Sequence, residues 1–387
     1  MSSRAKINPN LMKWARVEAG YNKKNLPKRF KDKFEKWEDG SVEPTWNQLR
    51  DVSNQYKRPS AFFFRTKEPS RDKIDFIEYR RSEISSKYKS PKLIYNIRKS
   101  KFKRDNYIEI LLNMKVPLID FSKNKFNSKN PLDFALRIRK VLDISLSRQK
   151  KWILNKNNDK DYKHYTFINE WKDAFNNLGI LVFETERVSL DEMKALTIYD
   201  KNYPIILLNG SDVVNSRIFS MVHELVHLMQ GETAICDLDD VLKKEIFCNA
   251  VTGEFLVPSK DLIKNPIIKD NNTEEWDDEN LMELSHEYGV SKELILRKLL
   301  DLKKITSDYY NSKVREWNNT HMNKKEAVGG GSYLNNQIKY NGKMYSRLVL
   351  SAYENNIINA TDFSEYMGLQ LKHIPKLETL IYGDSNG

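Results

Sequence analysis

The chain has 387 residues, of which 40% are hydrophobic and 11% aromatic, enough for roughly two or three packed domains. It contains no run near the roughly 20 apolar residues that a membrane-spanning helix needs, and its first residues lack the apolar segment of a secretory signal. The two cysteines, Cys236 and Cys248, do not make a disulfide framework. We therefore expect a soluble, cytoplasmic protein.

Charge is divided unequally along the chain. The formal net charge is +12, but residues 1–170 carry a net charge of +21 and residues 171–387 a net charge of −9. A strongly basic segment attracts nucleic acid through phosphate contacts and the release of counterions. The first half is therefore a candidate for nucleic-acid binding. The alternative is a solvated, lysine-rich surface with no such partner.

Residues 1–65 carry the pattern of several short helices joined by tight turns. Apolar residues recur at helical spacing in "LMKWARVEAG", residues 11–20, where Gly20 is placed to end the helix. A second helical pattern follows in "FEKWEDGSVEPTWNQLRDVSNQY", residues 34–56, which a turn at Gly40 interrupts. This arrangement predicts a helix-turn-helix module.

We expect residues 66–165 to form a mostly helical connector with clusters of basic residues. "FALRIRKVLDI", residues 134–144, has the pattern of an amphipathic helix, and the polar stretch "NKNNDKDYKH" marks a break before the next domain. Near the other end of the chain, the glycines at 329–331 indicate a flexible joint. The helical patterns beyond that joint predict a small helical tail.

Strand patterns appear in the central part of the chain. Residues 180–183 form a short apolar run, and "ALTIYDKNYPIILLNG", residues 195–210, predicts a hairpin. One strand of this hairpin can be a sheet edge to which a substrate strand adds by backbone pairing; the alternative is an ordinary core hairpin. A helix should follow, capped by Asn215 or Ser216 and ended by Gly231.

That helix, within "SRIFSMVHELVHLMQGE" at residues 216–232, carries a metal-binding pattern. His223 and His227 lie one turn apart on the same face, so their imidazoles can converge on one zinc ion at about 2.0–2.1 Å. Glu224 points away from the metal but is near enough to accept a proton from the attacking water, as a general base. The alternative is an apolar helix whose two histidines are core residues.

A catalytic zinc usually has three protein ligands and one open position, so a third ligand is needed. "KKEIFCNAVTGEFLVP", residues 243–258, predicts a second helix, and Glu245 lies 18 positions beyond His227, which leaves room for the chain to reverse and return past the metal. Glu254 competes if the helix has a different register. Cys248 is a zinc-competent thiol, although a cysteine there is more often a buried apolar residue. We favour Glu245.

A peptidase also needs a group that stabilises the developing oxyanion. Tyr199, Tyr203 and Arg217 are near in sequence, but no spacing argument selects among them. Arg217 can equally be a surface charge at the start of the helix. The sequence therefore leaves this role unassigned.

These patterns together predict a mostly α fold with a small β-sheet, in the α+β class. The expected layout is a helix-turn-helix module, a basic helical connector, a zincin-like metallopeptidase domain of the gluzincin type, and a glycine-rich joint with a helical tail. The corresponding boundaries are 1–65, 66–165, 166–327 and 328–387.

Several motifs resemble the ImmA/IrrE family of metallopeptidases. "KWARVEAG", "KFEKWEDGSVEPTWNQL" and "YKRPSAFFF" look like the Cro/repressor-type helix-turn-helix that opens its long members. "RIFSMVHELVHLM" followed by "EIFCNAVTGEFLVP" is similar to the family's pattern of a histidine-glutamate-histidine helix, then a glutamate, an asparagine and an apolar run closing with proline. The resemblance implies that His223, His227 and Glu245 bind Zn²⁺ and that Glu224 is the catalytic base. Asn249 matches the family's asparagine.

The resemblance also implies partners. Family membership implies a protein substrate, commonly a cognate DNA-binding repressor whose cleavage relieves repression in prophages, mobile elements or stress responses. Between Gly20 and Phe34 the chain is shorter and more lysine-rich than the usual helix-turn-helix. If this module docks on DNA, the phosphate contacts that we expect are Lys28, Arg29, Lys31, Lys33 and Lys36.

The main rival hypothesis is a DNA-binding regulator or antitoxin-like protein whose metal site is structural or sensory and never turns over. The basic half of the chain and the helix-turn-helix resemblance favour it. The intact Glu224 argues against it, because a purely structural site has no use for a general base. A third hypothesis is that the N-terminal module has lost DNA binding and recruits or restrains the substrate protein.

Overall fold

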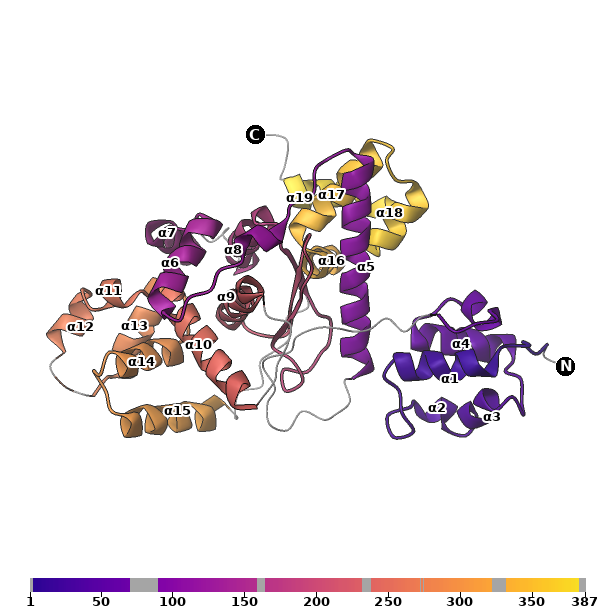
Figure 1. The fold of residues 1–387 in the computed structure, drawn as a ribbon, viewed down its shortest axis with the longest axis horizontal. Helices are drawn as coiled ribbons and strands as arrows, with labels where there is room; N and C mark the ends of the chain where they lie inside the picture. The colour runs from indigo at the N-terminus through magenta and orange to yellow at the C-terminus, as the bar shows by residue number, and fades with distance from the viewer. Residues whose placement is uncertain are drawn as a thin grey trace.

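The computed structural model describes residues 3–69, 90–158, 164–231, 238–271, 273, 275–321 and 332–382. Within these ranges the chain is mostly helical and contains one three-stranded sheet, so the predicted α+β class is confirmed at this level (Figure 1). No helix in the described ranges is long and apolar enough to cross a lipid bilayer. Cys236 and the glycines at 329–331 lie outside the described residues.

A small helical unit with its own apolar core forms the N-terminal part of the protein. Side chains start two of its helices: Asn8 caps one, and Thr45 and Gln48 form a capping box at the start of another. The elements are α1 (Pro9–Glu18), α2 (Lys28–Lys31), α3 (Phe34–Glu38), α4 (Trp46–Tyr56) and the 3-10 helix η1 (Ser60–Phe64). Because α2 and α3 have only four and five residues, the helix-turn-helix assignment stays a prediction.

The segment expected to be a connector is helical. Its elements are α5 (Pro91–Asn113), the 3-10 helix η2 (Phe121–Asn124), α6 (Pro131–Leu142) and α7 (Leu146–Asn158). The next helix, α8 (His164–Asn177), lies almost wholly beyond the boundary expected at residue 165. Ser90 caps α5 by accepting a hydrogen bond from the amide of Leu93 at 3.2 Å, and a proline follows at the first helical position. α5 stands between the N-terminal unit and the sheet (Figure 1), and the Arg98 guanidinium donates to the carbonyl oxygen of Glu18 on α1.

The sheet has the strand order β1-β3-β2. Its strands are β1 (Leu181–Glu184), β2 (Ala195–Ile198) and β3 (Ile205–Leu208). β2 and β3 pair antiparallel with Thr197 opposite Ile206, which confirms the predicted hairpin, and β1 pairs parallel with β3. Every residue of the three strands is buried, as expected for a sheet covered on both faces.

The remaining helices fall into two groups. The first contains α9 (Val214–Gln230), α10 (Leu238–Leu256), α11 (Ser259–Leu262), α12 (Pro266–Asp270), α13 (Asp278–Tyr288), α14 (Lys292–Asp301) and α15 (Ser307–His321). The second contains α16 (Tyr333–Asn341), α17 (Lys343–Glu354), α18 (Ala360–Met367), the 3-10 helix η3 (Leu371–His373) and α19 (Ile374–Tyr382).

Alternating side chains assign the two sheet faces to two apolar cores. Val182 and Ile206 join the core that α8, α9 and α10 share, whereas Phe183 and Leu207 join the core formed with α5 and α16 to α19. The sheet is therefore the middle of three layers. The second core contains α5, which precedes the domain boundary expected near residue 327, and α16 to α19, which follow it. The C-terminal helices therefore pack directly on the sheet.

Candidate metal centre

The helix that carries the site, α9, begins earlier than the sequence predicts. Its N-cap is Val213, which provides no side-chain cap, so the predicted capping by Asn215 or Ser216 is wrong. Both residues lie in the first turn. The side-chain nitrogen Nδ2 of Asn215 donates a hydrogen bond to the carbonyl oxygen of Val290 at 3.1 Å. This bond ties the start of α9 to the turn between α13 and α14. Gly231 ends the helix with a φ of 67°, as predicted.

His223 and His227 direct the same ring nitrogen toward one point. Their Nε2 atoms lie 3.0 Å apart, and both residues are buried. Glu245 on α10 places Oε2 at 3.3 Å from Nε2 of His223 and Oε1 at 3.2 Å from Nε2 of His227. Two ligands at about 2.1 Å from a tetrahedral ion lie about 3.4 Å apart, so this spacing suits three donors around one zinc ion.

The chemistry of the Glu245 carboxylate also suits a cation. Its Oε1 is buried and accepts no hydrogen bond from the described residues, so it retains an unused acceptor. Burial by itself raises the pKa of this carboxyl, but the two adjacent histidines more than offset burial and lower the pKa to about 2. The group is therefore an anionic oxygen donor facing two nitrogen donors.

Cys248 offers a second way to complete a three-donor set. The ligand atoms of His223, His227 and Cys248 all lie within 4.8 Å of one another. However, the thiol sulfur lies 3.6 Å from Nδ1 of His227, the ring nitrogen opposite the one that faces Glu245. One imidazole cannot present both nitrogens to the same ion. We therefore favour Glu245 as the third donor, because it shares the Nε2 side of both rings.

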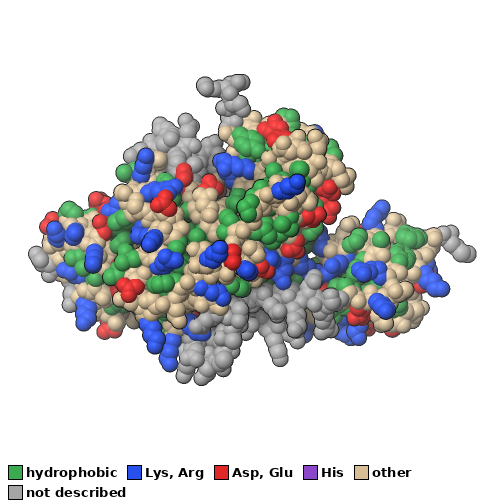
Figure 2. All heavy atoms as spheres, turned by 45° about the horizontal axis from the view of Figure 1, so that its top comes forward, with side chains coloured by type: hydrophobic (Ala, Val, Ile, Leu, Met, Phe, Trp, Pro, Cys, Tyr) green, Lys and Arg blue, Asp and Glu red, His purple; other side chains and the backbone are tan. Residues whose placement is uncertain are grey.

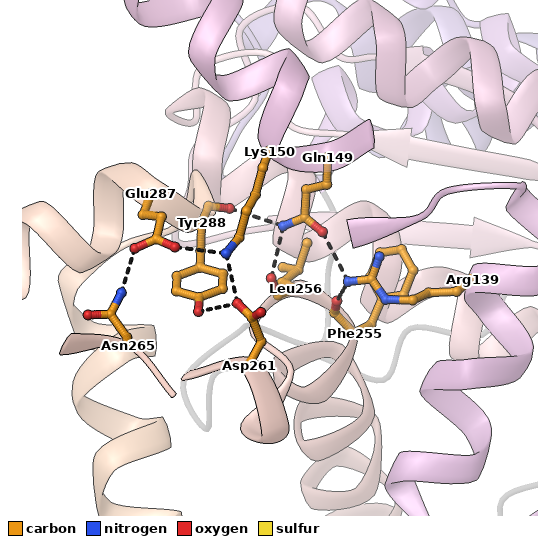
Figure 3. Close-up of polar contacts among 9 residues, drawn as sticks. All are labelled: Arg139, Gln149, Lys150, Phe255, Leu256, Asp261, Asn265, Glu287 and Tyr288. Carbon is orange, nitrogen blue, oxygen red and sulfur yellow. Dashed lines mark hydrogen bonds and ion pairs between the residues drawn. The ribbon is translucent and has the colours of Figure 1, made fainter. Parts of the chain in front are cut away.

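Polar side chains hold the C-terminal end of α10, the helix that carries Glu245. Figure 3 shows Arg139 on α6 and Gln149 on α7 reaching the last carbonyl groups of α10. The Arg139 guanidinium donates to the carbonyl oxygen of Phe255, and Gln149 Nε2 donates to that of Leu256 at 2.9 Å. The last carbonyls of a helix lack partners within it, so these contacts satisfy them and hold α10 against α6 and α7.

Glu224, the predicted general base, accepts a hydrogen bond from the sheet. Oγ1 of Thr197 on β2 donates to Oε2 of Glu224 at 2.6 Å, and both residues are buried. Thr197 faces α9 because it alternates along β2 with Leu196 and Ile198, which enter the opposite core. Thr197 was not among the site residues predicted from the sequence. The alternation of the hairpin places it on this face, but nothing in the spacing joins it to Glu224.

The hydrogen bond from Thr197 to Glu224 should contribute measurably to the free energy of unfolding. We expect Thr197→Val to lower the free energy of unfolding by about 1.5–3 kcal/mol, the contribution typical of a hydrogen bond to a charged group, because valine keeps the shape and removes the donor. Urea unfolding of the metal-free protein measures this change. Thr197→Ser retains the hydroxyl and should lose less; an equal loss in both variants would mean that the methyl group, not the hydrogen bond, is responsible.

Glu254, the competing ligand, has other partners. Its Oε2 accepts hydrogen bonds from Nζ of Lys298 and from Oγ of Ser259, each at 2.6 Å. Burial raises the pKa of Glu254, but these two partners more than offset burial, and the net pKa is lowered. Glu254 therefore anchors α14 and the start of α11 to α10. Asn249 is exposed on α10, one turn beyond Glu245.

Arg217 lies in a buried ion-pair network. Its guanidinium and the ammonium of Lys172 each lie 2.6 Å from the carboxylate of Glu184, the last residue of β1. Burial raises the pKa of Glu184, but the two cations more than offset it and the net pKa is lowered. Glu184 thus joins β1 to α8 through Lys172 and to α9 through Arg217. Arg217 is buried, so the alternative that it is a surface charge is wrong.

The two tyrosines considered for oxyanion stabilisation occupy different environments. Tyr203 is buried, and its ring makes an edge contact with Tyr107 at 5.0 Å between centroids. Tyr199 is partly buried, with Nζ of Lys125 at 5.1 Å from the centre of its ring. These contacts place Tyr203 in the core, and the oxyanion-stabilising role stays unassigned.

β2 is an edge strand among the described residues, but it is covered. Its four residues are at most 4% exposed. This burial favours the core-hairpin interpretation over an open edge to which a substrate strand adds.

The residues predicted to contact DNA are all exposed: Lys28, Arg29, Lys31, Lys33 and Lys36. They lie on α2, on α3 and between them. In the space-filling view, Lys and Arg side chains are distributed over this N-terminal unit (Figure 2). The observed exposure permits phosphate contacts and identifies no base-reading residue.

A histidine-glutamate-histidine helix, faced by a carboxylate from a second helix and packed on a small sheet, is an arrangement typical of metallopeptidases. Residues 175–300 match the sequence model of peptidase family M78, described as the IrrE N-terminal-like domain. The match spans all four predicted site residues and supports a peptidase of the ImmA/IrrE family; the N-terminal unit lies outside it. No curated protein and no solved structure matches the chain.

Proposed function

We propose that the protein is a zinc-dependent endopeptidase that cleaves a protein substrate, a cognate DNA-binding repressor, and thereby relieves repression in a prophage, mobile-element or stress response. The observation that carries this proposal is the convergence of three donors beside a buried glutamate. Nε2 of His223, Nε2 of His227 and the Glu245 carboxylate lie 3.0–3.3 Å from one another. The family match of residues 175–300 supports the peptidase class.

Each side chain has a distinct task in this proposal. His223, His227 and Glu245 hold the metal. Zinc, when bound, supplies a Lewis acid that lowers the pKa of water and polarises a substrate carbonyl. Glu224 accepts the proton of the attacking water at its carboxylate and passes it to the leaving amine nitrogen. Thr197 holds Glu224 Oε2 and so fixes the direction of that carboxylate.

The test begins with the metal content of the purified full-length chain, which should be about one zinc per chain for a single three-donor site. The proteome of the source organism is then incubated with zinc-loaded wild type or with Glu224→Gln, and new peptide termini are identified by mass spectrometry. Cleavage of a DNA-binding repressor by wild type alone supports the proposal. Absence of any wild-type-specific terminus contradicts an endopeptidase, and termini confined to other proteins contradict the repressor assignment.

DNA binding by the N-terminal unit is a second candidate function, alone in a non-catalytic regulator or beside the peptidase. The exposure of all five predicted contact residues favours it, as does the net charge of +21 in residues 1–170. Because α3 has only five residues, we propose binding through the phosphate backbone without base reading.

Salt dependence measures this binding. If all five side chains neutralise phosphates, changing Lys28, Arg29, Lys31, Lys33 and Lys36 to glutamine should reduce the slope of log K against log salt by about 4–5, since each contact contributes about 0.9. Fluorescence anisotropy with a labelled random-sequence duplex gives both slopes. If wild type fails to bind this duplex at low salt, the proposal is wrong.

A further inference from the structure

We propose that Cys248, supported by Gln230, is a positioning residue that fixes the tautomer and the orientation of His227 as a metal ligand. This inference rests on the proposed metal centre. Cys248 is fully buried on α10, and its sulfur lies 3.6 Å from Nδ1 of His227. The Cys248 thiol also donates a hydrogen bond to Oε1 of Gln230, with 3.8 Å between sulfur and oxygen.

The contacts bracket the His227 ring from a single helix. Glu245 and Cys248 lie three residues apart on α10, so they share one face of that helix. Glu245 approaches the ring at Nε2, at 3.2 Å, and Cys248 approaches it at Nδ1. Gln230 lies three residues beyond His227 on α9, so the chain of contacts runs from α9 to α10 and back. A rotation of the ring would disturb both edges.

The direction of the hydrogen bonds selects the tautomer. When the thiol proton is donated to Gln230, the sulfur is left as the acceptor for the proton on Nδ1 of His227. Nε2 is then the unprotonated nitrogen, and it is the one that faces His223 and Glu245. A metal-binding histidine needs such a partner on its second nitrogen, a place that a carboxylate, a carbonyl or a water usually takes.

The same geometry separates this role from direct ligation by the thiolate. A sulfur ligand added to two histidines and Glu245 would fill the fourth position and close the site, as in structural zinc sites, whereas catalytic sites keep that position open. With the sulfur on the Nδ1 side of the ring, the open position is preserved. Cys248 therefore acts on the metal through His227.

The experiment measures metal binding and needs no substrate. Zinc affinity is determined by chelator competition for wild type, Cys248→Ala, Gln230→Leu and Val251→Ala, and absorption spectra are recorded with Co²⁺ in place of zinc. Val251 is equally buried on α10, so its alanine variant is matched for loss of packing. We expect Cys248→Ala to bind zinc about 10–100-fold more weakly, the usual cost of losing an outer partner. Gln230→Leu should weaken binding in the same direction, Val251→Ala should bind like wild type, and the Co²⁺ spectrum should lack a thiolate charge-transfer band.

The contrary results are distinguishable. A thiolate charge-transfer band that is present in wild type and absent in Cys248→Ala would make Cys248 a ligand and overturn the positioning role while leaving a metal centre. Unchanged affinity in Cys248→Ala, or an equal loss in Val251→Ala, would also overturn it. If Cys248→Ala does not fold by circular dichroism, Gln230→Leu decides: unchanged affinity in that variant rejects the proposal. Failure of wild type to bind either metal would instead remove the proposed metal centre itself.

Discussion

Glu245→Ala is expected to abolish stable zinc binding. The substitution removes one of three donors that lie 3.0–3.3 Å apart, and it removes the only carboxylate among them. Losing an outer partner of a ligand typically costs about 10–100-fold in metal affinity, and losing a ligand itself should cost more. Metal analysis after dialysis and chelator competition measure the effect. Cleavage should be lost together with zinc, because the proposed reaction requires the metal.

Glu254→Gln is the matched control for this variant. Glu254 is on the same helix, but it bonds to Lys298 and Ser259. Its substitution should lower stability while leaving about one zinc per chain. Full zinc occupancy in Glu245→Ala would show that the third ligand is another residue. Loss of zinc in Glu254→Gln alone would identify Glu254 as that ligand.

Glu224→Gln is expected to lower the rate of cleavage by about 10²–10⁴-fold, the range typical of a general base, without loss of zinc. Glutamine keeps the length of the side chain and an oxygen that can accept from Thr197 Oγ1, so the fold and the donor set should be retained. It removes the carboxylate that accepts the proton. Cleavage of the repressor identified from the proteome, measured together with metal content, checks both halves of this expectation.

The two variants separate the two roles. Glu245→Ala should lose cleavage together with the metal, whereas Glu224→Gln should lose cleavage and keep the metal. Undiminished cleavage by Glu224→Gln would reject the mechanism. Loss of zinc from this variant would show that Glu224 supports the three metal ligands. That result would favour the rival hypothesis of a DNA-binding regulator with a non-catalytic metal site.

Local patterns made part of the architecture predictable. The apolar run at 180–183 and the hairpin at 195–210 correspond to β1, β2 and β3, since strand patterns depend on neighbours in the sequence. The stop of α9 at Gly231 was predictable for the same reason. The start of α9 was not, because Val213 provides no side-chain cap, whereas Asn215 and Ser216, two and three residues further on, are typical capping residues and suggested a later start.

The pair His223 and His227, with Glu224 between them, could be identified from the amino-acid order alone, because residues four apart on a helix share a face whatever surrounds the helix. The choice among Glu245, Cys248 and Glu254 required the folded structure, because all three residues lie on α10 and each faces a different neighbour. The rotation of α10 against α9 brings Glu245 to the Nε2 atoms, Cys248 to Nδ1 of His227, and Glu254 to Lys298. The partner of Glu224, on a strand 27 residues earlier, was likewise decided by the packing of α9 on the sheet. Spacing within one helix is a local property of the chain, whereas the meeting of side chains from different elements depends on how those elements pack.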